Sequence, residues 1–426
     1  MLHKKNIFYF LLALIPFCFS NFFSYSDIFY LSLIYLLLII IPILFIRKNI
    51  IEIQASMLDI SFWAYVYIFL GLAAFVQVSN NVIPWVDYDH QSHLIFQSII
   101  IFFIGVISFI FGRYSKINLV FPLRTISHKR TNYLFFLSFL SLVFIFMSLG
   151  FETIFYPRTA FTLLRENTTS SINLLTALLQ TSLLFSLIGY LMLYRKKSIS
   201  IISMIPCIII CLVYFNPVRS DRLSFLILYI SIFLFYSGFN KKVWAFILIF
   251  GLAFLFPVLD FFRSSLQGND AITFDFNKNM ITGDFDALST LIMSINYVQY
   301  NDFLYFTNFF TPLFVFIPRI IWPSKPFSSS FLLTNDNNVD FPNIAASMWA
   351  EGFLGFGYIG VFLLLFSIGI LIRNLNLYYN KSDFITIITI YFTPFMIYFL
   401  RGDMYSVGFK VMPMIFWAYL ITKKSK

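Results

Sequence analysis

The feature that most constrains this chain is a succession of apolar segments, each close to twenty residues long, with the charges confined to the stretches between them. The hydrocarbon core of a bilayer, about 30 Å thick, is crossed by roughly 20 apolar residues in an α-helix. Only 11% of the residues are charged, whereas soluble domains carry about 25%. A surface with so little charge faces lipid, so the sequence predicts an all-α polytopic membrane protein and excludes a soluble domain.

Apolar runs bounded by charges or turn residues predict about twelve transmembrane helices. They lie at about residues 7–24, 28–46, 60–78, 94–112, 133–150, 173–194, 198–216, 223–239, 243–259, 353–372, 384–400 and 406–422. The first run resembles a signal peptide but lacks a small-x-small cleavage site, so we expect an uncleaved span. The chain thus divides into spans 1–9 (residues 1–259), a long loop (260–352) and spans 10–12 (353–426).

The basic residues orient this layout. With the N-terminus in the cytoplasm, 19 of the 29 Lys and Arg residues fall on the cytoplasmic side with three acidic residues, a net charge of +16. The opposite side then holds ten basic and 16 acidic residues, a net charge of −6. Cytoplasmic loops carry the excess of Lys and Arg, so both termini are predicted to be cytoplasmic. The total charge of +10 is thereby explained by orientation, and no nucleic-acid partner is expected.

Residues 260–352 form the one long connection, on the outer side, and loops of this length in a compact protein are usually functional or disordered. This loop is too aromatic and apolar for disorder. Its early part is polar and turn-rich, whereas residues 303–321 are apolar and carry Pro312 and Pro318. We expect residues 303–321 to lie at the interface or to re-enter the membrane; an unresolved pair of spans is the alternative.

Metal sites and disulfides are not expected. Cys18, Cys207 and Cys211 lie inside apolar runs, where cysteine serves as a small apolar side chain. His90 and His93 follow two aspartates, but they lack the i, i+4 spacing of a helical metal-binding pair. A solvated loop is the preferred interpretation, so no metal or cofactor is predicted.

Arginines at the outer ends of spans are the first functional candidates, because charges near lipid are costly to hold. A guanidinium presents a rigid fork of donors that suits phosphate oxygens. The candidates for binding a pyrophosphate are Arg219, Arg222, Arg263, Arg319, Arg401 and the nearby Lys325, with Trp322 beside them. For each, a local ion pair (Arg401 with Asp403, Arg219 or Arg222 with Asp221) or contact with lipid headgroups is the alternative.

Glu351 is the candidate general base. It stands at the start of span 10, just before Gly352, Gly355, Gly357 and Gly360. A carboxylate beside aromatic residues there could accept a proton from a sugar hydroxyl, and the glycines would let a chain or lipid approach closely. Capping of its own helix by a negative residue is the alternative. Trp322, Tyr300 and Trp349 are candidates for stacking on sugars, or else ordinary interfacial aromatics.

Two segments carry a family resemblance. The string from Ile317 to Pro326 (IPRIIWPSKP) resembles a stretch that recurs in Wzy-type polymerases of oligosaccharide repeat units, and Ser347, Glu351, Gly357 and Gly360 are similar to the same family's serine, glutamate and Gly-x-x-Gly pattern. The related O-antigen ligases carry a histidine eleven residues before the first glycine of that pattern. Here that residue is Ala346, which favours a polymerase over a ligase.

The resemblance implies a GT-C-like glycosyltransferase in the inner membrane, with its active site facing the periplasm or exterior. Such an enzyme joins undecaprenyl-pyrophosphate-linked repeat units into O-antigen, capsule or a similar glycan. Its partners would be those lipid-linked oligosaccharides, membrane lipid and a chain-length regulator protein. Glu351 would act as base and Arg319 would stabilise the charge on the leaving pyrophosphate, without a metal.

A flippase for lipid-linked oligosaccharides is the alternative from another class. It would also have about twelve spans and cationic residues for an anionic headgroup. A flippase is expected to show two similar halves and charges near the membrane midplane, and the sequence shows neither. A structural scaffold subunit is a third reading, which leaves the clustered outer arginines unexplained.

Overall fold

The computed structural model describes residues 28–51, 56–87, 92–150, 170–215, 222–236, 240–255, 276–305, 307–314, 317, 321–337, 339 and 344–425. The chain divides into two compact units. Unit 1 comprises Met1–Asn118, Lys241–Arg373 and Met396–Gly408, and unit 2 comprises Leu119–Asn240, Asn374–Phe395 and Phe409–Lys426. The last three long helices therefore contribute residues to both units.

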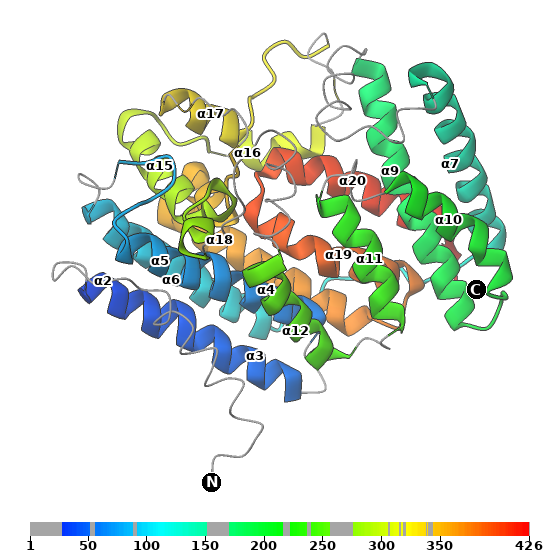
Figure 1. Ribbon diagram of the computed structural model, residues 1–426, viewed down its shortest axis with the longest axis horizontal. Coiled ribbons are helices and arrows are strands. Elements are labelled where there is room, and N and C mark those ends of the chain that lie inside the picture. The colour runs from blue at the N-terminus through cyan, green and yellow to red at the C-terminus, as the bar shows by residue number, and fades with distance from the viewer. Residues whose placement is uncertain are drawn as a thin grey trace. The chain divides into compact units, whose positions relative to one another are not determined.

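Unit 1 begins with three helical stretches (Figure 1). They are α2 (Ile28–Leu33), η1 (Ile34–Ile40) and α3 (Ile41–Ile51); α4 (Met57–Tyr65), η2 (Val66–Leu72) and α5 (Ala73–Ser79); and α6 (Ser92–Tyr114). The π-helical segments η1 and η2 pack against each other. A Cβ at Gly71 would collide with the Leu38 carbonyl, so glycine is what allows the two backbones to approach. α12 (Lys241–Phe250), continued by η5 (Gly251–Leu255), packs against α4.

The stretch from α4 to α5 lies at the centre of unit 1, because every residue from Met57 to Ser79 is buried. It starts with a capping box in which the Ser56 hydroxyl accepts the Asp59 amide and the Asp59 carboxylate accepts the Ser56 amide, an arrangement that satisfies two free donors at a helix start. Asp59 also pairs with Arg113 at the end of α6, with 2.6 Å between Oδ1 and Nε.

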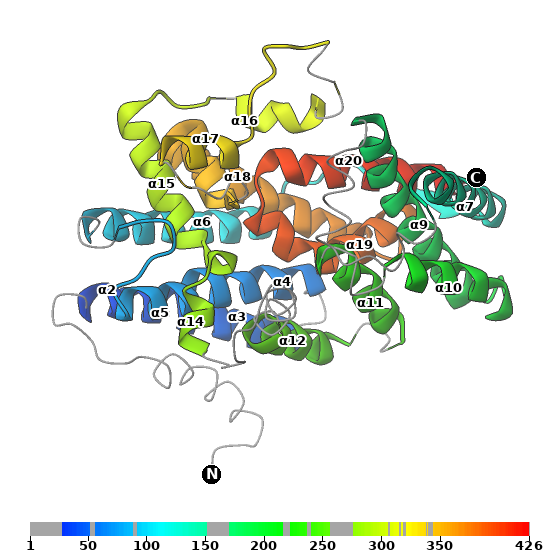
Figure 2. The same ribbon diagram turned by 45° about the horizontal axis from the view of Figure 1, so that its top comes forward.

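Short helices lie in the described parts of the long loop and belong to unit 1 (Figure 2). They are α14 (Phe276–Met280), η7 (Gly283–Phe285), α15 (Ala287–Tyr300), α16 (Thr307–Phe310), η8 (Thr311–Phe314) and α17 (Ser329–Asp336). α15 packs against α6 and α17, and its residues from Ala287 to Ile295 are buried. No helix was expected at α15 from the sequence. Leu288, Leu291, Ile292 and Ile295 have the i, i+3, i+4, i+7 spacing that could have revealed it.

α18 (Met348–Tyr378) is interrupted at Phe356 and Gly357, where the backbone leaves the helical region. Gly357 has φ +61°, a value that favours glycine. On either side of the break a Cβ at Gly360 would collide with the Gly352 carbonyl. The glycines at the start of span 10 therefore break the helix and let its two parts pack closely.

Unit 2 is built from α7 (His128–Leu149), α9 (Ser170–Arg195), η4 (Ile202–Met204), α10 (Ile205–Tyr214) and α11 (Arg222–Tyr236), with parts of α18, α19 (Asp383–Arg401) and α20 (Met404–Ile421). α7 packs along α9, and α10 and α11 also contact α9. β1 (Arg124–Ile126) pairs antiparallel with β2 (Thr422–Lys424), with Thr125 opposite Lys423. This small ribbon was not predicted, and it is the only sheet among the described residues, beside an isolated bridge between Ile83 and Val86.

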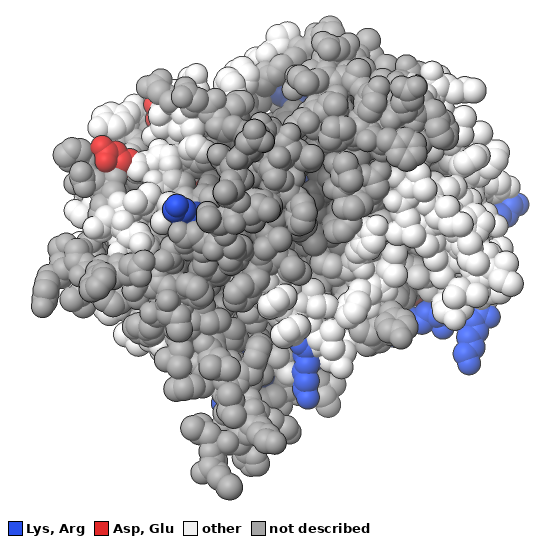
Figure 3. All heavy atoms as spheres, in the orientation of Figure 1, with Lys and Arg blue, Asp and Glu red and all other residues white. Residues whose placement is uncertain are grey.

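Six helices in the described part of the chain are long and apolar enough to cross a membrane. They are Phe29–Ile50, Met57–Ser79, Ser92–Tyr114, Met348–Tyr378, Asp383–Arg401 and Met404–Ile421. Charged side chains are sparse among the described residues on the face drawn in Figure 3. The chain is thus a helical membrane protein, as predicted. Predicted spans 5–9 overlap helices α7 to η5, which are not among those six, and the first predicted span lies outside the described residues.

Candidate functional site

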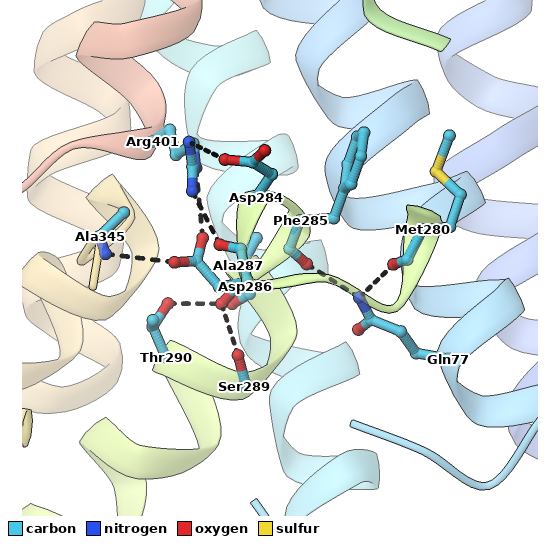
Figure 4. Close-up of polar contacts among 11 residues, drawn as sticks. Gln77, Met280, Asp284, Phe285, Asp286, Ala287, Ser289, Thr290, Ala345 and Arg401 are labelled. Carbon is cyan, nitrogen blue, oxygen red and sulfur yellow. Dashed lines mark hydrogen bonds and ion pairs between the residues drawn. The ribbon is translucent and has the colours of Figure 1, made fainter. Parts of the chain in front are cut away.

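Two polar clusters in unit 1 join the long loop to the ends of the long helices, and the first surrounds Asp286. This residue precedes α15, and its backbone carbonyl accepts the Thr290 amide and the Ser289 hydroxyl. Its side chain reaches Arg401 at the end of α19, with 3.3 Å between Oδ1 and Nε. Its other oxygen accepts the Ala345 amide at 3.2 Å. Figure 4 shows Arg401 lying over this turn.

All three nitrogens of the Arg401 guanidinium contact residues of the same turn. Its Nη2 donates to the Gly283 carbonyl at 2.9 Å, and its Nη1 lies 3.8 Å from Asp284 Oδ1. The Asp286 side chain is 2% exposed, against 21% for that of Asp284. Burial raises the pKa of the Asp286 carboxyl above its ordinary value, and the charge of Arg401 and the Ala345 amide oppose that rise.

A side chain of α5, Gln77, also binds this turn. Gln77 Nε2 donates to the carbonyls of Met280 and Phe285, both at 2.9 Å (Figure 4). Gly283 faces the ring of Trp85, which occupies the space a side chain would need. The start of α15 is therefore fixed by three separate parts of unit 1.

The second cluster surrounds Glu351 in the first turn of α18. Glu351 is 0% exposed. Its Oε2 accepts Asn308 Nδ2 at 2.8 Å and the Ser329 hydroxyl at 2.9 Å, and its Oε1 accepts the Met404 amide at 2.9 Å. Asn308 also donates to the Glu351 carbonyl at 2.9 Å. One carboxylate thus connects α16, α17, α18 and the start of α20.

Asp403 adds a second carboxylate at the same helix start. Its Oδ1 accepts the Ser406 amide at 2.7 Å, which is the geometry of an N-cap. Its Oδ2 accepts the Ser330 and Ser406 hydroxyls at 2.5 and 3.0 Å. Ser329 and Ser330, adjacent in α17, therefore bind two different carboxylates.

The segment that carries the family resemblance lies against the same region. Lys325 is buried, donates to the Ile317 carbonyl at 3.0 Å and sits 5.0 Å from the ring of Tyr405 in α20. Trp322 is half-buried, with its indole nitrogen 3.1 Å from the Ser324 hydroxyl. A Cβ at Gly408 would collide with Pro312 of η8, so η8 packs directly on α20.

Four of the eight predicted site residues are described in unit 1: Glu351, Lys325, Trp322 and Arg401, of which Arg401 and Glu351 lie in different clusters. Arg219, Arg263 and Arg319 lie outside the described residues, and Arg222 begins α11 without a described side chain. Their predicted roles at a pyrophosphate stay predictions. No group of three or more His, Cys, Asp or Glu side chains in the described part of the chain could hold a metal ion.

The contacts of Arg401, Glu351 and Trp349 bear on the alternative roles that the sequence left open for them. Arg401 pairs with Asp284 and Asp286, whereas Asp403 binds serines. Glu351 lies in the first turn of α18, as the capping alternative expects, and it also accepts an amide at the start of α20. Trp349 is 0% exposed and donates to the Phe102 carbonyl at 3.1 Å, which leaves it unavailable for stacking on a sugar.

Sequence reasoning missed the partners that make both clusters. Asn308, Ser329 and Ser330 are common polar residues 21 or more positions from Glu351, and no local spacing marks them. Asp286 lies in the early part of the long loop, which the sequence marks only as polar and turn-rich. Its position directly before the apolar spacing of α15 is a helix-start signal, which could have singled it out.

Comparisons with protein-family models, with curated proteins and with solved structures found no match to this chain. The class of protein is therefore defined by the fold and the two clusters: a helical membrane protein in which a long loop is bound to the ends of α18, α19 and α20 by carboxylates.

Proposed function

We propose that this protein is a membrane-embedded glycosyltransferase that polymerises oligosaccharide repeat units carried on undecaprenyl pyrophosphate. The proposal builds on the Wzy-type resemblance of residues 317–326 and 347–360. It places the protein in the inner membrane, with a GT-C-like plan and its site on the outer side.

The observation that carries the proposal is the convergence of those two segments on the start of α20. Lys325, from the first segment, lies at Tyr405, and Glu351, from the second, accepts the Met404 amide. Ser329, just after the first segment, binds Glu351 directly. Residues that are separate in the sequence but belong to one motif set are expected to meet at one site, and these contacts support that expectation.

The proposed reaction needs a base and a group that stabilises a leaving anion. The acceptor's terminal hydroxyl attacks the anomeric carbon of the donor glycan, the bond to undecaprenyl pyrophosphate breaks, and the hydroxyl proton passes to Glu351. Arg319, with Arg263 and Lys325, would stabilise the charge on the departing pyrophosphate, because a guanidinium fork matches phosphate oxygens.

Twelve spans with both termini in the cytoplasm are part of the proposal, and contacts at the helix ends support them. Segments predicted to be cytoplasmic contact one another within each unit: Lys48 with Tyr114, Arg373 with Asn118, Lys196 with Asp383, and Arg124 with Thr422. Segments predicted to be outside do the same: Gln77 with Met280, and Arg401 with Asp286. Two segments in direct contact lie on the same side of a bilayer.

The test is extension of purified lipid-linked repeat units by the purified protein. We expect a ladder of products that grows by one repeat, with Arg319→Lys inactive at equal abundance because the fork is lost while the charge stays. Full activity of that variant would remove Arg319 from the pyrophosphate site. A ladder abolished by chelator would contradict metal independence.

A strain that lacks the gene separates the proposal from its alternative. A missing polymerase leaves surface glycan limited to a single repeat unit. Accumulation of lipid-linked repeats that face the cytoplasm would instead indicate a flippase.

A further inference from the structure

Arg401 was predicted to bind pyrophosphate, but its surroundings are acidic. One guanidinium faces two carboxylates, those of Asp284 and Asp286, and a carbonyl oxygen at Gly283. The three groups together carry a net charge of −1 when ionised, and like charges repel one another. An anion with two or more negative charges is therefore a poor ligand at this position.

The ion pair of Arg401 and Asp286 instead joins the two chain segments that lead to the Glu351 cluster. Asp286 holds the Ala345 amide, and the chain runs from there through Ser347 into α18 and Glu351. Arg401 ends α19, and the chain runs from it through Asp403 to Met404, whose amide Glu351 accepts. The two sides of the Glu351–Met404 contact are thus tied together a few residues upstream.

Buried apolar side chains pack on both sides of the residue that Asp286 binds. Met293, Leu333, Ile344, Ala346 and Leu354 form one buried apolar cluster that joins α15, α17 and α18. Ile344 and Ala346 flank the residue whose amide Asp286 binds. Since close-packed side chains transmit small displacements, loss of the ion pair would be felt at Glu351.

We propose that Arg401 and Asp286 form a clamp that sets the position of Glu351 against the start of α20, so that Arg401 is a positioning residue and not a pyrophosphate ligand. This inference rests on the proposed function for its kinetic consequences, but the clamp itself does not depend on it.

The test is a double-mutant cycle with Arg401→Gln, Asp286→Asn and the combined variant, assayed by extension of lipid-linked repeat units. A clamp predicts that each single variant lowers the maximal rate about tenfold or more, and that the combined variant is no slower than the worse single one. The substrate concentration for half-maximal rate should stay within about twofold, since positioning acts on the chemical step.

A pyrophosphate ligand predicts a different pattern. Arg401→Gln would then raise the half-saturating concentration of the lipid pyrophosphate and weaken inhibition by inorganic pyrophosphate, while Asp286→Asn would leave both unchanged. That result would overturn the clamp. Asp302→Asn, the same change at an exposed carboxylate just past α15, is the matched control and should keep the wild-type rate.

A second measurement guards against unfolding and against failure of the proposed function. The midpoint temperature of unfolding in detergent should fall for both single variants and should fall no further in the combined variant. The midpoint of Arg401→Lys should fall less than that of Arg401→Gln. Additive losses would refute the coupling. If the wild-type protein extends no glycan at all, the polymerase proposal fails while this cycle still decides the clamp.

Discussion

At the scale of single residues, the proposed role of Glu351 as a base can be separated by experiment from its observed role as a buried hydrogen-bond acceptor. As a base it must take a proton, and as a buried acceptor it holds Asn308, Ser329 and Met404. A glutamine at this position keeps one acceptor oxygen but turns an NH2 group toward a donor. A buried donor left without a partner costs about 1–3 kcal/mol.

We therefore predict that Glu351→Gln stops chain growth and also lowers the free energy of unfolding by about 1–3 kcal/mol. Asn308→Ala removes one donor to the same carboxylate without changing it, so its loss of stability should be similar and its loss of activity much smaller. Glycan extension and unfolding in detergent measure the two effects. Equal inactivity of both variants at equal stability would mean that the carboxylate serves packing alone.

At the scale of elements, the start of α18 packs on α4 and α6 through Trp349, and a glycine in α6 leaves space for its ring. The indole lies among Phe62, Tyr65 and Phe102. A Cβ at Gly105 of α6 would collide with its ring nitrogen. Because Trp349 is two residues before Glu351, the fit of these two helices helps to fix the first turn of α18.

Gly105→Ala should therefore destabilise the protein even though alanine favours helices. Overpacking a close contact costs about 1–3 kcal/mol, more than the roughly 1 kcal/mol that alanine contributes over glycine in a helix. Gly251→Ala in η5 is the control, because nothing lies within 4 Å of the added atom. Unfolding in detergent measures both, and a second change, Trp349→Phe, should restore part of the loss. A Gly105→Ala protein as stable as wild type would contradict the contact.

At the scale of the whole molecule, topology is the property most open to direct measurement. Tyr300 is 84% exposed and lies in the loop predicted to be outside, whereas Lys197 and Ser425 are exposed in segments predicted to be cytoplasmic. Cys207 and Cys211 are buried, and replacing Cys18 by serine removes the remaining thiol.

In that background, a membrane-impermeant thiol reagent should label Tyr300→Cys in cells with an intact inner membrane. Lys197→Cys and Ser425→Cys should react only after the membrane is permeabilised. Labelling of Tyr300→Cys and Lys197→Cys from the same side would require an even number of spans between them, against the three predicted.

Much of the fold could be predicted from the sequence because a bilayer imposes a simple rule on it. Twenty apolar residues form a spanning helix whatever surrounds them, so the boundaries of α6, α19 and α20 were close to those expected. The short helix α15 and the ribbon of β1 with β2 escaped prediction. Their stability comes from burial against distant segments, which local propensity does not report.

The sequence by itself thus determined that this protein is a helical membrane protein and that Glu351, Lys325 and Arg401 are among its few charged residues. Only the tertiary structure decided their partners. Glu351 meets Asn308, Ser329 and Met404, and Arg401 meets Asp286 across more than a hundred residues. Hydrophobic length is a local property of a chain, whereas a buried charge takes whichever donor or acceptor the packing brings to it, and that is fixed only when the helices have assembled.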